Sequence, residues 1–236
     1  MIVMKKFIIY TLLSVCLLIV CGYGLLQVSK SRTFQFFGSS VSRVDTEEKV
    51  IALTFDDGPE SYTNEILSVL KKKQVKATFY VIGERLQENL EIGKRITDEG
   101  HELGNHSYTH QRFLFKSQSF IDSEIQRTNQ LIRETGYGGA ITFRPPYGKK
   151  LFGLPWYLNK HNIETIMVDV EPDTYGTTSD FFVEYTVANT KAGSIILLHP
   201  FCETCGEARK AVPLIIDALK EKGYSFVTVS ELLSRR

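Results

Sequence analysis

Two adjacent carboxylates, Asp56 and Asp57, end an apolar run of strand length that begins at residue 50. Neighbouring side chains on a strand point to opposite faces, so both acids can serve one site only where the backbone leaves strand geometry. The following Gly58-Pro59 provides such a break. One acid could then bind a cation while the other transfers protons. The alternative is a surface turn, because Asp-Gly and Gly-Pro are common turn dipeptides.

Two histidines, His106 and His110, are four residues apart in a chain that has only five. On one helical turn this spacing places both imidazoles on the same face, as metal ligands require. Two histidines and one carboxylate form a known catalytic zinc set that leaves a position open for water. A pair at this spacing is often incidental, but this one follows a strand-like segment. Together with the acids, the pair predicts a metal site.

The chain resembles the polysaccharide deacetylase family, also called the NodB-homology carbohydrate esterases. Five short motifs carry the resemblance, and they occur in the family's order from about Val50 to the C-terminus. They are Thr54-Phe55-Asp56-Asp57-Gly58-Pro59, His106-Ser107-Tyr108-Thr109-His110, Arg144-Pro145-Pro146-Tyr147-Gly148, a weaker match from Glu171 to Tyr175, and Leu197-Leu198-His199.

The resemblance implies metal-assisted hydrolysis of an acetyl group. Asp57, His106 and His110 would bind Zn²⁺ or another divalent transition metal such as Co²⁺, and Asp56 would be the catalytic base. The metal would polarise the acetyl carbonyl and lower the pKa of water. The backbone N–H of Tyr147 would help to hold the developing oxyanion.

The remaining motif residues would complete the site. His199 would protonate the leaving amine, Leu197 would shape the acetyl pocket, and Arg144 would grip Asp56 through its planar fork and hold it ionised. The fourth motif departs from the family's Asp-x-x-x-Trp, so we expect Glu171 to partner His199 and Tyr175 to contact the sugar. Asp169 and Asp173 are alternatives for the acid.

The N-terminal segment 1–29 differs in kind from the rest of the chain. Lys5-Lys6 precede an apolar run from Phe7 to Ser29, and about 20 such residues suffice to cross a bilayer. The basic residues favour a cytoplasmic N-terminus. The run lacks an Ala-x-Ala cleavage pattern, so we expect a single-pass anchor with an extracellular catalytic domain. Secretion after signal cleavage is the alternative.

Residues 30–48 are mixed and polar and predict a linker before a catalytic domain at 49–236. From there strand and helix signals alternate, which indicates an α/β fold with a parallel sheet. The resemblance implies an irregular barrel with about seven parallel strands, in which strand ends share one face. An open doubly wound sheet is the alternative. Expected helices include 86–99, and a last strand covers 225–229.

Three functions remain open on the sequence alone. The first is removal of N-acetyl groups from a cell-envelope polysaccharide, with peptidoglycan favoured by the anchor. The others are an O-acetyl esterase on xylan-like glycans and an inactive glycan-binding module. A net charge of +1 gives no sign of a nucleic-acid partner, and we expect a monomer. Cys202 and Cys205 could staple a loop or form a redox motif. Trp156 is expected in the core, with a stacking wall for the sugar as the alternative.

Overall fold

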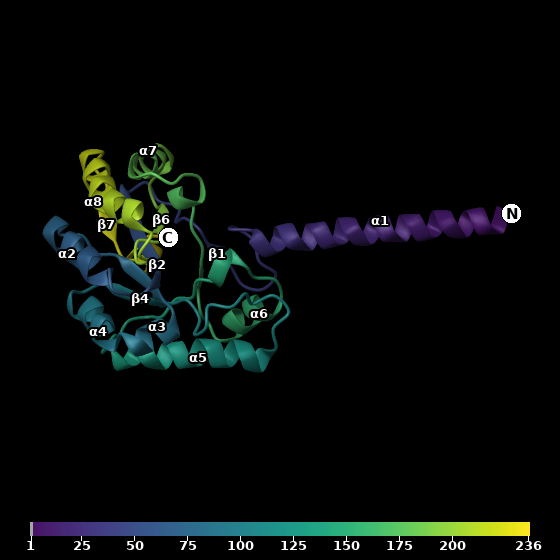
Figure 1. Cartoon of the computed structure of the whole chain (residues 1–236), viewed down its shortest axis with the longest axis horizontal. Coiled ribbons are helices and arrows are strands. Elements are labelled where there is room, and N and C mark those ends of the chain that lie inside the picture. The colour runs from purple at the N-terminus through teal and green to yellow at the C-terminus, as the bar shows by residue number, and fades with distance from the viewer. Residues whose placement is uncertain (1) are drawn as a thin grey trace.

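The computed structural model describes residues 2–236. An isolated helix, α1 (Ile2–Lys30), projects from a compact domain that contains all the other elements (Figure 1). Its segment Met4–Lys30 contains an 18-residue window with a mean hydropathy of 2.3 and no buried residues. By length and composition, this helix could cross a membrane as an anchor or serve as a signal sequence.

The domain is built on a parallel sheet with β2 (Val50–Gly58) at its centre. β2 pairs with β3 (Thr78–Val81), β6 (Ile195–Leu198) and β7 (Ser225–Val227), and β3 pairs with β4 (Glu102–Asn105). β2 is buried on both faces, with Ile51 and Phe55 in one apolar cluster and Ala52 in another. This two-sided burial explains why its sequence is a continuous apolar run.

Single bridges close these strands into an irregular barrel. Phe143 links β4 to β5 (Thr165–Ile166), and Val170, a few residues further on, pairs with Ile196 of β6. β1 (Ser40–Val41) lies parallel to β5. The expected irregular α/β barrel is therefore confirmed, and the seven strands do not form an open doubly wound sheet.

Helices surround the barrel where apolar side chains recur at helical spacing. Ser117 caps the long helix α5, and Gly136 follows it with a positive φ of 86°, as helix ends favour. The helical elements are α2 (Thr63–Lys73), α3 (Gly83–Glu88), α4 (Leu90–Asp98), α5 (Gln118–Glu134), α6 (Gly153–Lys160), α7 (Ser179–Asn189), α8 (Gly206–Glu221) and α9 (Val229–Leu233), with short 3₁₀ turns η1 (Pro146–Gly148) and η2 (Pro172–Thr174).

Two expected elements have different bounds. The single helix expected over 86–99 is broken at Asn89, whose φ and ψ of −127° and 42° interrupt the helix between α3 and α4. The last strand ends at Val227 because Thr228 starts α9, where it forms a capping box with Glu231.

The expected linker at 30–48 is folded against the domain. Val41 and Val44 are buried, and the Val44 N–H donates to the Gly193 carbonyl at 2.9 Å. The Gln35 side chain donates to the carbonyls of Phe37 and Ser39. Mixed polarity was therefore a poor guide here, because Val41 and Val44 are buried against segments that are distant in the sequence.

Candidate active site

A bulge in β2 brings the two adjacent acids to one site. The β2–β3 register shifts between Asp56 and Gly58, and Asp57 has a φ of 70°, which non-glycine residues seldom adopt. An extra residue in one strand re-aims the side chain there. Asp56 Oδ2 and Asp57 Oδ1 consequently lie 3.6 Å and 3.5 Å from the same atom, His106 Nε2. The expected break in strand geometry therefore lies at Asp57 itself.

The two histidines lie on a loop after β4, so the expected helical turn is wrong. Ser107 and His110 have positive φ angles of 68° and 55°, which no helical turn contains. Each conformation is held by a local contact: Asn105 Oδ1 accepts the Ser107 N–H at 2.8 Å, and Ser107 Oγ accepts the His110 N–H at 3.0 Å. The loop still directs both imidazoles at Asp57, with His110 Nε2 3.2 Å from Asp57 Oδ1.

A buried carboxylate on α5, Glu124, fastens this loop. Its Oε2 accepts the N–H groups of Tyr108 and Thr109 at 3.0 and 2.8 Å, and its Oε1 accepts the Thr109 hydroxyl at 2.9 Å. Glu124 lies outside the five sequence motifs and was not among the expected site residues. The available signal was an acid among the inward-facing positions of α5, next to Ile121 and Ile125.

Asp57, His106 and His110 fit a divalent transition metal. Their ligand atoms lie within 4.8 Å of one another, and the buried Asp57 Oδ1 has no hydrogen-bond partner among the described residues. Burial opposes ionisation of Asp57, but nearby basic groups, chiefly His106 and His110, lower its pKa. Burial, aided by His106, lowers the pKa of His110 to about 4. A carboxylate and a neutral imidazole are the states that bind metal.

Asp56 is buried beside Arg144. Arg144 Nη1 donates to Asp56 Oδ1 at 2.6 Å and to Thr54 Oγ1 at 2.8 Å. The guanidinium lies over the Tyr80 ring at 4.0 Å. The grip uses one nitrogen and is not the expected two-pronged fork. It nevertheless places a positive charge against the carboxylate.

His199 is paired with Asp173, which corrects the expectation that Glu171 is its partner. The His199 Nδ1 lies 2.8 Å from Asp173 Oδ2, while Glu171 forms an ion pair with Arg32. Asp169 accepts from Ser194 and from the Ile195 N–H. Burial lowers the pKa of His199, but the hydrogen bond and charge of Asp173, with Asp56 and Asp57, raise it to about 9.

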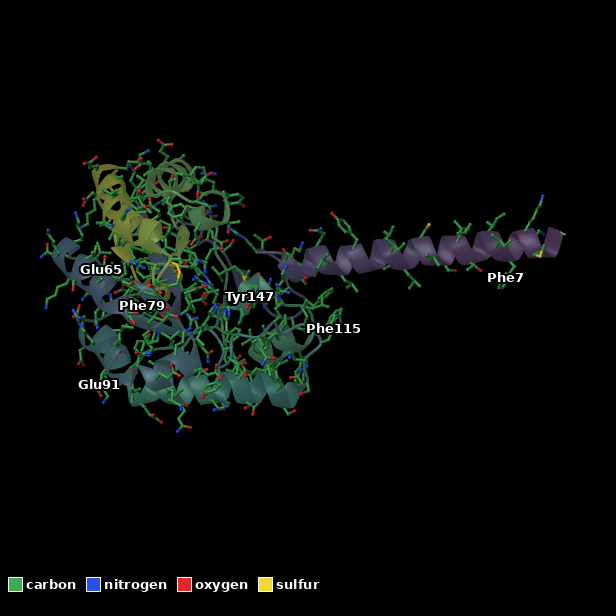
Figure 2. The ribbon with its side chains drawn as sticks, viewed as in Figure 1. Phe7, Glu65, Phe79, Glu91, Phe115 and Tyr147 are labelled. Carbon is green, nitrogen blue, oxygen red and sulfur yellow. A yellow bond between two sulfur atoms is a disulfide. The ribbon has the colours of Figure 1, made fainter. Side chains whose placement is uncertain are left out.

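The metal-ligand candidates, Asp56, Arg144 and His199 line one pocket of 610 Å³. Tyr147, Leu197 and Thr174 also line it. Tyr175, the expected sugar contact, is not among the described residues lining it; its ring is 59% exposed and stacks on Tyr185. Trp156 is 41% exposed, so its assignment to the core is wrong. Figure 2 shows Tyr147 close to the end of α1 that joins the domain.

The Cys202 and Cys205 thiols are joined in a disulfide. It lies in the loop between His199 and α8, where Arg209 donates to the Pro200 carbonyl at 3.0 Å. The loop-staple interpretation therefore agrees with the structure.

The sequence model of polysaccharide deacetylases matches residues 43–166, more than half of the chain. The chain belongs to the polysaccharide deacetylase family. It is 34% identical to a peptidoglycan-N-acetylglucosamine deacetylase of Bacillus cereus, over 80% of this chain and 91% of that protein. It is 39% identical to a bifunctional xylanase/deacetylase of Pseudobutyrivibrio xylanivorans, over 80% of this chain but only 31% of that protein.

Solved structures in this family have the same fold. The Bc1960 peptidoglycan N-acetylglucosamine deacetylase superposes with a TM-score of 0.76 at 32% identity, covering 81% of this chain and 91% of that one. A family 4 acetyl xylan esterase of Clostridium thermocellum in complex with a cobalt ion superposes with a TM-score of 0.71 at 32% identity. The match covers 78% of this chain and 90% of that one.

Proposed function

We propose that this polysaccharide deacetylase is a metal-dependent hydrolase that removes N-acetyl groups from an N-acetylglucosamine-containing polysaccharide of the cell envelope, with peptidoglycan as the first candidate. The observation that carries the proposal is the single pocket that collects Asp57 and both histidines beside a buried acid, Asp56, and a protonated His199. A binding module needs neither a base nor an acid. The peptidoglycan deacetylase that matches this chain over 91% of its own length supports the substrate class.

In this proposal Asp57, His106 and His110 hold the metal, with Zn²⁺ and Co²⁺ as the leading candidates. When bound, the metal polarises the acetyl carbonyl and makes water a better nucleophile at neutral pH. The Asp56 carboxylate, which accepts a hydrogen bond from Arg144 Nη1 at 2.6 Å, accepts the proton of the attacking water. Proton transfer by a positioned side chain of this kind typically contributes about 10²–10⁴-fold.

His199 supplies the second proton transfer. Asp173 binds its Nδ1, which leaves Nε2–H free to protonate the amine as the C–N bond breaks. We propose that the Tyr147 N–H donates to the oxyanion and that the buried Leu197 side chain contacts the acetyl methyl group. Both residues line the pocket. Glu171 and Tyr175 have no part in this scheme.

We further propose that α1 remains attached as a single-pass anchor and that the domain lies outside the cell. Lys5-Lys6 before the apolar run favours this orientation. The end of the helix is also part of the domain, since Ser29 is buried and its carbonyl accepts the Lys150 N–H at 3.0 Å. A signal peptide would be removed instead.

The test combines metal analysis with two product assays on the purified full-length chain. Peptidoglycan, chitin oligomers and acetylated xylan are supplied, and both acetate and free amine are measured. We expect the wild-type protein to release acetate and free amine in equal amounts from an N-acetylated glycan. His106→Ala should lose the metal and release neither product. Full metal occupancy in His106→Ala would contradict the ligand assignment.

A second candidate is an O-acetyl esterase. It is favoured by the two matches to proteins of xylan metabolism. Acetate released from acetylated xylan without any free amine would replace the first proposal by this one. Bound metal without acetate from any substrate would indicate an inactive glycan-binding module.

A further inference from the structure

The end of α1 forms part of the wall of the catalytic pocket. Lys30, its last residue, and Arg32 both line the pocket together with Asp57 and His199. The preceding Ser29 is 1% exposed. The apolar helix therefore joins the domain at the active site, without an intervening tether.

Two basic side chains, Lys150 and Arg32, join the segment that follows α1 to the domain. The buried Lys150 ammonium donates to the Ser31 carbonyl and, at 3.2 Å, to the Phe34 carbonyl. Arg32 donates to the Val168 carbonyl at 3.4 Å and forms an ion pair with Glu171. Lys150 follows the turn that carries Tyr147, and Glu171 precedes the partner of His199. Both sides of the pocket are thus joined to the base of α1.

The length of the apolar run places the pocket at the bilayer surface. Phe7 to Ser29 lies between Lys6 and Lys30, and a helix of this length spans about 35 Å at 1.5 Å per residue. The hydrocarbon core of a bilayer is about 30 Å thick. With Lys5-Lys6 at one surface, Lys30 reaches the headgroups of the other, and the pocket wall that it forms lies at the same level.

Exposed aromatic side chains lie beside the segment that follows α1, where Phe34 contacts Phe36 and Phe36 contacts Phe152. We call them the aromatic rim; they are Phe34, Phe36, Phe115, Phe152 and Trp156. Phe115 is 89% exposed, and Figure 2 shows it projecting on the side from which α1 leaves. The rings of Phe36 and Phe152 stack with their centroids 4.4 Å apart. Trp156 lies one helical turn after Phe152 on α6, and its backbone N–H donates to the Phe152 carbonyl.

Basic side chains accompany the rim. The Lys160 ammonium lies over the Trp156 ring at 5.0 Å, and Arg112 lies over Tyr147 at 4.8 Å. Lys149 lines the pocket beside Lys30. Trp and Phe mixed with Lys and Arg are the composition of surfaces that lie in the headgroup region, particularly of anionic membranes.

We propose that the face formed by the pocket mouth and the aromatic rim lies against the outer surface of the membrane. This inference rests on the proposed anchor and deepens the proposed function. It places the catalytic groups where a glycan held at the membrane surface can reach them. The partner of this face is a lipid surface, since the rim continues the apolar surface of α1.

The chain's only tryptophan is Trp156, so its fluorescence reports on the rim directly. The full-length protein is reconstituted in nanodiscs of phosphatidylcholine and phosphatidylglycerol, with and without a nitroxide label on the lipid headgroup. We expect Trp156 emission to fall by about half in the labelled discs, because an interfacial tryptophan lies at headgroup depth.

The matched control moves the reporter to the opposite end of the domain. Leu214 is 47% exposed on α8, which lies away from α1 (Figure 1). In a Trp156→Phe background, Leu214→Trp should show no headgroup quenching. In the same background Phe115→Trp, a second rim position on an exposed loop, should be quenched like Trp156.

Equal quenching at the rim and at Leu214→Trp, or none at either, would overturn the inference. Lack of quenching at Phe115→Trp alone would do the same. None of these measurements uses catalysis. A protein that is quenched but releases no acetate would refute the proposed function and leave the membrane-facing rim established.

Discussion

Two carboxylates separated by one peptide bond have different surroundings in this site. Asp56 is buried against Arg144, while Asp57 faces two imidazoles. We therefore expect Asp56→Asn to keep the metal and lose roughly 10²–10⁴-fold in turnover, as when a general base is removed. Metal content and the rate of acetate release are measured on the same sample. Near-normal turnover would exclude Asp56 as the base.

His199 should be distinguishable from the metal site by the leaving group. An amine leaves only when its nitrogen is protonated, whereas a phenolate leaves unaided. His199→Ala should therefore lose about 10²–10⁴-fold on an N-acetylated oligosaccharide but much less on an aryl acetate. Equal losses on both substrates would show that this side chain shapes the site and that the proton has another source.

The Asp173–His199 pair predicts a pH effect with a definite sign. The acid must be protonated, so activity falls as pH rises through the His199 pKa, which Asp173 helps to raise to about 9. Asp173→Asn removes the anionic partner, lowers that pKa, and should move the alkaline limb of the pH–rate profile to lower pH. Glu171→Gln is the matched control, and the alkaline limb of its pH–rate profile should not move. A shift with Glu171→Gln alone would restore Glu171 as the partner.

At the scale of elements, α5 holds the loop that carries both histidines. Glu124→Ala removes three contacts and leaves two N–H groups without their acceptor. Loss of such support around a metal site typically lowers metal affinity by about 10–100-fold. We expect a loss in this range, measured by competition with a chelator below the melting temperature. Glu134 lies on the exposed side of α5, so Glu134→Ala should leave the metal affinity unchanged. Unchanged metal affinity in Glu124→Ala would mean that the loop keeps its conformation without Glu124.

At the scale of the whole molecule, α1 and the barrel act as one unit because Ser29, Arg32 and Lys150 join them. The mature protein should sediment with membranes, require detergent for release, and have an intact mass that includes Phe7 to Ser29. Cell fractionation followed by mass spectrometry makes this measurement. Protein recovered mainly from the medium, with an N-terminus beyond Leu26, would contradict retention of the anchor.

Residue types and their order determined the chemistry of this protein. The motifs around Asp56, His106, Arg144 and His199 indicated the family, and the apolar run in β2 with its helices indicated a barrel. These signals are local: a short motif or a periodic pattern is complete within a few residues.

Only the tertiary structure decided which side chains meet. Asp173 replaced Glu171 beside His199 because η2 turns the chain after Pro172. Glu124 reached the histidine loop from α5, and residues 30–48 folded onto β5. The sequence offered Asp173 only as one of several acids and Glu124 only as an acid among apolar positions, because a local pattern does not show which segments the folded chain brings together.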